Sequence, residues 1–298
     1  MNIAFFGDTH GQAYHLLAAV ITWQKRIGTA LDMVIQVGDF GAERLEKMIQ
    51  NTDVFLRYTA NNPAEFDFLR VLYAQNQLAN HLREIRQQLQ CPIYFLRGDH
   101  DEVAWLRQLS LNTQNKTIPI DPFDLFHYVP DGTIIHCDGM KLAFFGGVEH
   151  PGRGKEGTEH DPAAFTALLA TKRGEVDVLI THEPPYGCST GFHGQTQGSS
   201  QVSQLIEMIQ PRYHLAGHLH TMIGPKQYGP TTYFGLNRFG GLLKSRSGQR
   251  EASHTLQQGT MALLNTETGI LEFVTGDWLA EFSQECEAIV EPLAACLY

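Results

Sequence analysis

The chain has 298 residues, of which 43% are hydrophobic and 18% are charged, so it can bury a sizeable core. Its formal net charge of -10 argues against binding nucleic acid over its whole surface, and a polynucleotide substrate would need a local basic patch. The five cysteines are odd in number and lack a C-x-x-C spacing, so we expect free thiols and a cytoplasmic location. Residues 2–6 are too short for the apolar segment of a signal peptide, and no stretch approaches the roughly 20 apolar residues of a membrane span. We therefore expect no membrane partner.

Short apolar runs typical of β-strands recur along the chain, and each is followed by a turn that carries aspartate or histidine. The runs comprise residues 2–6, 33–37, 93–97, 176–181 and 213–216. The polar residues in the turns are Asp8, His10, Asp39, Asp99, His100, His182, His218 and His220. Because the carboxyl ends of strands in an open sheet meet at one crevice, we expect these turns to converge although they lie far apart in sequence.

The segments between these runs carry helical signals. Residues 12–26 read as a helix, and residues 63–90 have apolar side chains at steps of three and four. We expect the second segment to cover the sheet as part of a helical insert near 51–90, with a partner-binding helix as the alternative. A helical tail is expected near 277–298, and residues 1–298 are expected to form a single domain.

The middle of the chain carries a strong hairpin signal. Asp138-Gly139 separates the apolar runs 132–137 and 140–145, and this dipeptide favours a tight two-residue turn. Three later segments also have strand character and would complete a second sheet, namely residues 231–235, 260–264 and 270–275.

Three loops could contribute to a binding site. Residues 146–157 form a Gly-rich basic loop, in which Arg153 offers a bidentate fork for phosphate and Lys155 a point charge; a solvated surface loop is the alternative. Residues 183–200 are rich in Gly and Ser and are placed to shape a substrate pocket. The most basic stretch, residues 238–250, is either a disordered surface loop or an anion-binding rim.

The residue types in the turns are those of a two-metal site. Carboxylate oxygens and neutral imidazoles suit Mn, Fe, Zn or Co, and the lack of paired cysteines among the turns argues against a thiolate zinc site. Two cations about 3.5–4 Å apart lower the pKa of a bound water and clamp phosphoryl oxygens. A single aspartate after a strand is more often a helix cap, and a single histidine is more often a surface or core residue. The recurrence of the motifs in order favours the metal site.

The motifs D-x-H, G-D, G-N-H-[DE], H and G-H-x-H occur in this order, and over roughly residues 1–225 the chain resembles the calcineurin-like metallophosphoesterases. The resemblance implies an α/β fold, a four-layer αββα sandwich in which two mixed β-sheets are flanked by helices. It also implies two divalent metal ions, most simply Mn, with Fe, Zn, Co or Ni as alternatives. The implied activity is hydrolysis of phosphate mono- or diesters by a metal-activated hydroxide.

The resemblance also assigns roles to the polar residues of the turns. The ligands that it implies are Asp8, His10 and His220 for the first metal, Asp39 as the bridge, and Asp99, His182 and His218 for the second metal. His100 is expected to be the catalytic histidine that binds no metal and either stabilises the transition state or protonates the leaving oxygen.

One position departs from the family pattern, because Asp99 stands where the family has a neutral asparagine. We expect Asp99 still to ligate, to hold the second metal more tightly, and to lower its Lewis acidity and its attraction for phosphate. The alternative is that Asp99 caps a helix that starts near Glu102. The same change motivates a second hypothesis, a non-catalytic interaction module that retains the fold.

The resemblance leaves the substrate open. Residues 38–42 break the Gly-Asp-x-x-Asp-Arg-Gly motif of the phosphoprotein phosphatases, which counts against that activity. Asp39-Phe40 and the helical insert are similar to the RNA lariat debranching enzymes, but Asp8 stands where those enzymes have cysteine. We expect a small-molecule or nucleotide-like phosphoester substrate, with RNA as a further candidate.

Overall fold

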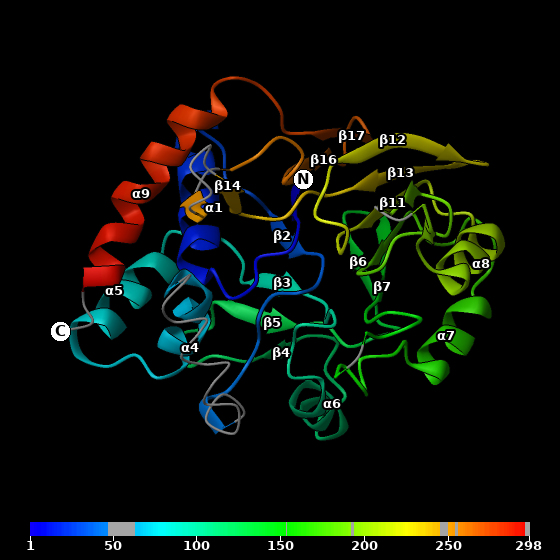
Figure 1. The fold of residues 1–298 in the computed structure, drawn as a ribbon, viewed down its shortest axis with the longest axis horizontal. Coiled ribbons are helices and arrows are strands. Elements are labelled where there is room, and N and C mark those ends of the chain that lie inside the picture. Colours follow the sequence, from blue (N-terminus) through cyan, green and yellow to red (C-terminus); the bar gives the residue numbers. More distant parts are fainter. Residues whose placement is uncertain (47–62, 153, 192–193, 245–249, 254–255, 296–298) are drawn as a thin grey trace.

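The computed structural model describes residues 1–46, 63–152, 154–191, 194–244, 250–253 and 256–295. They form two large β-sheets that face each other between two groups of helices (Figure 1). The first part of the expected insert, residues 51–62, lies outside the described residues, and so does Arg153.

The first sheet has seven strands in the order β17-β16-β1-β2-β3-β5-β4. Strands β1, β2, β3 and β5 run parallel. The sheet is mixed, because β16 pairs antiparallel with β1, β4 pairs antiparallel with β5, and β17 pairs antiparallel with β16. Its strands are β1 (Asn2–Phe6), β2 (Met33–Gln36), β3 (Ile93–Phe95), β4 (Ile118–Pro119), β5 (Phe126–Tyr128), β16 (Met261–Asn265) and β17 (Ile270–Phe273).

The second sheet has six strands in the order β12-β13-β11-β8-β7-β6, and it is also mixed. Its strands are β6 (Ile134–Cys137), β7 (Met140–Phe145), β8 (Val178–Thr181), β11 (Tyr213–Ala216), β12 (Ile223–Tyr228) and β13 (Thr231–Gly235). The predicted hairpin is confirmed, since β6 and β7 pair through a turn in which Asp138 and Gly139 have φ values of 47° and 78°. Two successive left-handed residues are what the tight turn requires.

Helices cover the outer face of each sheet (Figure 1). On the first sheet lie α1 (Ala13–Ile27), η1 (Pro63–Phe66), α4 (Asp67–Leu72), α5 (Asn76–Arg86) and α9 (Leu279–Ala295). On the second lie α7 (Pro162–Leu169) and α8 (Ser200–Ile209), while α6 (Val103–Leu111) follows the turn after β3. The predicted four-layer αββα architecture is therefore confirmed. Among the described residues, no helix is both long and apolar enough to cross a membrane.

Strand β1 shows why its sequence is apolar without alternation. Ile3 and Phe5 pack into the core between the two sheets, whereas Ala4 and Phe6 pack into the core beneath α1. Side chains of successive strand residues point to opposite faces, so a strand that is buried on both faces is apolar throughout. This burial fixes the position of the turn that follows β1.

The expectation for the last strands is wrong in one respect. Only residues 231–235 lie in the second sheet; β16 and β17 belong to the first, where Asn265 pairs with Asn2. Strand character is local, but sheet membership depends on which strand edge is left open by the rest of the fold.

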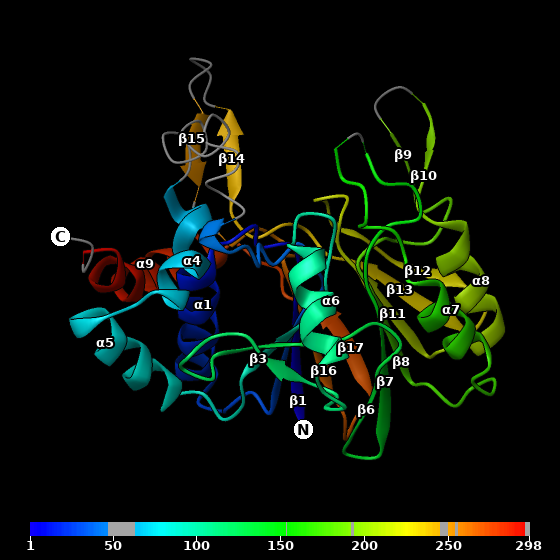
Figure 2. The same ribbon diagram turned by 90° about the horizontal axis from the view of Figure 1, so that it is seen from below.

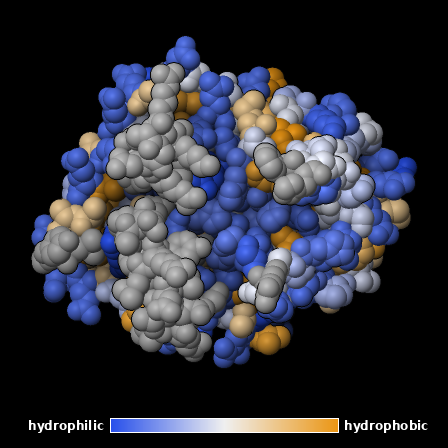
Figure 3. All heavy atoms as spheres, viewed as in Figure 1, coloured by the Kyte–Doolittle hydropathy of each residue, from blue (hydrophilic) through white to orange (hydrophobic). Residues whose placement is uncertain are grey.

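Two short hairpins project from the same side of the molecule (Figure 2). They are β9 (Ser189–Thr190) with β10 (Thr196–Gln197), and β14 (Gly241–Lys244) with β15 (Arg250–Ser253). Part of the basic stretch 238–250 therefore forms strand β14, whereas one of the two interpretations from the sequence was a disordered surface loop. The space-filling view shows mainly hydrophilic residues across the middle of the face seen in Figure 1 (Figure 3).

Candidate metal centre

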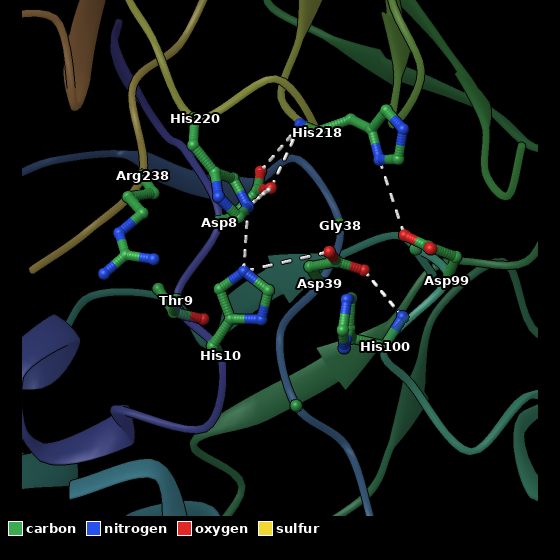
Figure 4. Close-up of polar contacts among 12 residues, drawn as sticks. Asp8, Thr9, His10, Gly38, Asp39, Asp99, His100, His218, His220 and Arg238 are labelled. Carbon is green, nitrogen blue, oxygen red and sulfur yellow. Dashed lines mark hydrogen bonds and ion pairs between the residues drawn. The ribbon is translucent and has the colours of Figure 1, made fainter. Parts of the chain in front are cut away.

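The polar turns converge, but they come from both sheets rather than from one. Strands β1, β2 and β3 of the first sheet lead to Asp8 and His10, to Asp39, and to Asp99. Strands β8 and β11 of the second sheet lead to the remaining ligand candidates, which are His182, His218 and His220. The site therefore lies where the carboxyl ends of the central strands of two facing sheets meet (Figure 4).

The side chains form two groups of metal-binding type that share one residue. The first group consists of Asp8, His10, Asp39 and His220, and the second of Asp39, Asp99, His182 and His218. Within each group, the donor atoms lie within 4.8 Å of one another. A neutral imidazole and a carboxylate are suitable donors for Mn, Fe, Zn or Co, so the residues present fit two such ions.

The two oxygens of Asp39 face different histidines. Its Oδ2 lies 3.9 Å from His10 Nε2, and its Oδ1 lies 3.4 Å from His182 Nε2. The backbone N–H of His100 donates to the same Oδ1 over 2.7 Å, which holds the carboxylate between the groups. This orientation is the one that a bridging carboxylate needs.

The imidazoles are oriented for coordination. His182 Nδ1 lies 3.1 Å from the carbonyl oxygen of Val37, so a proton on Nδ1 leaves Nε2 free to face the second group. In the first group, His220 Nε2 lies 3.0 Å from Asp8 Oδ2 and 2.9 Å from His10 Nε2. Ring nitrogens this close to one another and to carboxylates are placed to share one cation.

Backbone strain gathers at this site. Four non-glycine residues of the two groups have left-handed φ values, namely His10 at 45°, Asp39 at 52°, His218 at 68° and His220 at 52°. Such conformations cost free energy for residues with a Cβ atom, and they persist where the surrounding structure imposes them. Their clustering indicates a functional constraint on these turns.

Two glycines allow the turns to approach so closely. A Cβ on Gly98 would lie 2.1 Å from Asp39 Oδ1, and a Cβ on Gly217 would lie 2.0 Å from Asp8 Oδ1. Any side chain at either position would displace a carboxylate of the candidate centre. Glycine is therefore required at these two positions because there is no room for a Cβ atom.

The site concentrates negative charge. Burial raises the pKa of Asp39 well above its ordinary value, although His182 opposes the shift, and nearby Asp8 and Asp99 reinforce it. Burial opposes the charged form of His182, but Asp39 and Asp99 raise its pKa to about 10. For Asp8, burial alone would raise the pKa, but the hydrogen bond from His220 and the nearby histidines lower it to about 2. Bound cations would relieve the repulsion among the carboxylates.

Asp99 faces the second group and does not cap a helix. Its Oδ1 lies 3.3 Å from His182 Nε2 and 3.4 Å from His218 Nδ1.

The neighbouring residue Asp101 was given no role from the sequence, yet it connects the turns that follow β2 and β3. Asp101 Oδ2 accepts from Gly98 N over 2.7 Å, and its Oδ1 accepts from Gly41 N over 2.8 Å. The sequence signal that could have identified Asp101 is its place as the fourth residue of the Gly98-Asp99-His100-Asp101 turn.

Two basic residues lie beside the groups. Lys155 Nζ contacts Asp99 Oδ2 and lies 2.6 Å from His100 Nε2, and burial together with Lys155 lowers the pKa of His100 to about 4. Arg238 lies beside His10 and His220 on the side of the first group (Figure 4). The sequence singled out the loop of Lys155 and the stretch of Arg238, but not these contacts.

Comparisons with known proteins identify the family of the chain and support its fold. The family model described as calcineurin-like phosphoesterase matches residues 1–222, so the chain belongs to that family. A crystal structure that is 15% identical superimposes with a TM-score of 0.53 over 92% of this chain and 98% of its own, which supports the fold.

Two curated relatives have matching segments. A UPF0046 protein of Caenorhabditis elegans is 33% identical over 138 residues, which cover 45% of this chain and 46% of that protein. Zinc finger CCCH domain-containing protein 64 of Arabidopsis thaliana is 25% identical over 255 residues, which cover 81% of this chain and 38% of that protein. The chain thus matches less than half of the length of either relative.

Proposed function

We propose that the protein is a metal-dependent phosphoesterase that hydrolyses phosphate mono- or diesters at a dinuclear centre. The observation that carries the proposal is that Asp39 joins two groups of carboxylate and imidazole donors, with His100 directly beside them. Family membership supports the reaction class. A small or nucleotide-like substrate is our proposal within that class, and RNA is a further candidate.

Each ion would have its own ligands and would share Asp39. Asp8, His10 and His220 would hold the first, and Asp99, His182 and His218 would hold the second. When bound, two divalent ions supply an activated water and neutralise the charge of the phosphoryl oxygens. Carboxylate and imidazole donors accept several metals, and we propose Mn as the working ion.

His100 and Arg238 would act on the substrate. The low pKa of His100 supports a neutral ring that stabilises the transition state by a hydrogen bond, rather than an imidazolium that protonates the leaving oxygen. Arg238 would contact a phosphate oxygen or a second anionic group on the side of the first metal. We also propose that Arg153 contacts a phosphate of the substrate. We propose a cytoplasmic location, because Cys91, Cys137, Cys188 and Cys286 are unpaired.

A substrate assay tests the proposed function. Protein that has been supplied with Mn should hydrolyse an aryl phosphate or a bis-aryl phosphate, and excess chelator should abolish the activity. A panel that contains both esters and Mn, Fe, Zn, Co and Ni separates monoester from diester preference. Absence of turnover across this panel would contradict the proposal.

The alternative is a non-catalytic interaction module that retains the fold, and Asp99 is the motif change that motivates it. Elemental analysis separates the two functions. Less than about one metal per chain after purification without chelator, with no rebinding, would favour the module.

The role of Arg238 predicts a specific kinetic change. Arg238→Ala should raise KM roughly ten-fold while changing kcat less, because the lost contact binds substrate and transition state alike. The matched control is Arg173→Ala on the connection between α7 and β8, which lies at the opposite end of β8 from His182. Equal KM values for the two variants would remove Arg238 from the substrate site.

A further inference from the structure

Asp99 presents its two oxygens to different surroundings. The side chain is only 5% exposed, and its Oδ1 faces His182 Nε2 and His218 Nδ1 at 3.3 and 3.4 Å. The other oxygen, Oδ2, contacts Lys155 Nζ. One oxygen is therefore in the second donor group, while the other is paired with an ammonium group.

The backbone around Lys155 is held by a buried anchor. The Arg97 side chain, which is 0% exposed, donates from Nη1 to the carbonyl oxygen of Thr158 over 3.1 Å and from Nη2 to that of Glu159 over 2.8 Å. Thr158 Oγ1 in turn donates to the carbonyl oxygen of Lys155 over 2.7 Å. The contact with Asp99 thus comes from a segment tied to the interior, next to the end of β3.

The pairing changes the charge that a metal at the second group would meet. Asp99 adds one negative charge compared with a neutral oxygen ligand, and the ammonium of Lys155 adds one positive charge beside it. The expectation that Asp99 lowers the Lewis acidity of the second metal took account of the first charge alone. With both charges present, the pair offers one oxygen donor and no net charge.

We propose that Lys155 is a positioning residue that selects Asp99 Oδ1 for the second metal and offsets the charge of the carboxylate. The Asp99–Lys155 pair then acts as a single neutral oxygen ligand. The same ammonium, 2.6 Å from His100 Nε2, fixes the orientation of the catalytic ring. This inference rests on the proposed function, because it concerns the metal ions of that centre.

Metal affinity is the direct test, since it is measured without turnover. Calorimetric titration of chelator-stripped protein with Mn²⁺ should show that Lys155→Met binds the second ion at least about ten-fold more tightly, because repulsion of a divalent ion outweighs the loss of one orienting contact. Turnover per occupied site should fall in the same variant. Lys155→Arg should bind Mn²⁺ with an affinity closer to wild type than Lys155→Met does.

Two further variants complete the design. Asp99→Asn should lower the affinity for the second ion. Asp99→Asn combined with Lys155→Met should return this affinity to within a few-fold of wild type. Lys172→Met removes the same charge at an exposed position in the connection between α7 and β8 and serves as the control.

The outcomes separate this inference from the proposed function. If Lys155→Met binds Mn²⁺ like Lys172→Met while the protein still binds metal and hydrolyses esters, the role of Lys155 is refuted and the proposed function stands. If wild-type protein binds none of Mn²⁺, Fe²⁺, Zn²⁺, Co²⁺ and Ni²⁺, both are refuted.

Discussion

Among single residues, His100 separates catalysis from metal binding. Its backbone N–H donates to Asp39, but its ring belongs to neither donor group. His100→Ala should therefore retain both metals and slow turnover by roughly 100-fold or more, the usual scale for a lost acid or electrostatic group. Elemental analysis and kinetics at saturating metal measure the two effects. Unchanged turnover would remove His100 from the mechanism.

Most of the candidate site could be predicted residue by residue, because each strand and the turn after it form one local pattern. The contacts of Lys155 and Arg238 could not be predicted in this way. They depend on where long loops cross the ends of the strands, and no local spacing encodes that path. Asp101 was missed for a related reason, since its partners at Gly41 and Gly98 lie on two separate turns.

Among structural elements, the loop after β7 depends on one buried ion pair. Arg97 Nη2 lies 2.7 Å from Asp131 Oδ2, with side-chain exposures of 0% and 8%. Arg97→Met should lower the free energy of unfolding by about 3 kcal/mol, because it leaves a buried carboxylate without its cation. The exposed pair Lys141–Glu175 is the control, and Lys141→Met should cost much less, because solvent screens an exposed ion pair. If urea denaturation shows similar losses of unfolding free energy for Arg97→Met and Lys141→Met, the greater importance of the buried pair is contradicted.

The helices of the outer layer carry a pH-dependent contact. His15 of α1 is buried, with Nδ1 3.6 Å from Asp67 of α4 and Nε2 3.7 Å from Glu287 of α9. Burial opposes its charge, but the two carboxylates raise its pKa from 6.5 to about 9. A raised folded pKa gives a contribution to stability that is complete below pH 6.5 and is lost as the pH rises through about 9.

We therefore expect the free energy of unfolding to fall by about 2–3 kcal/mol between pH 6.5 and 9. His15→Gln should show a smaller fall over this range. Urea denaturation of both proteins at several pH values measures the difference. Parallel pH profiles would show that other groups cause the change.

The elements themselves were predicted more completely than their assembly. The hairpin at Asp138-Gly139 is confirmed because its turn chemistry is local. Strands β16 and β17 were recognised as strands, but they were assigned to the wrong sheet. Their place beside β1 follows from an open strand edge, which exists only once the first sheet has formed.

For the whole molecule, the two sheets bring donors from both halves of the chain to one place. Asp8 and Asp39 come from the first sheet, and His182 and His218 from the second. Metal that binds only the folded chain should stabilise it by about 2.7 kcal/mol per site at 100 times the Kd. As the metal concentration is raised, bound metal, the free energy of unfolding and activity should therefore rise together.

The most direct test is a titration of chelator-stripped protein with Mn²⁺, in which bound metal and hydrolysis of a bis-aryl and an aryl phosphate are followed in the same samples. We predict two ions per chain and full activity only when both are bound. Asp39→Asn, which removes the charge shared by the two groups, should lose both metal and activity. Saturation with two ions and no hydrolysis of either ester, or full hydrolysis in excess chelator, would contradict the dinuclear phosphoesterase.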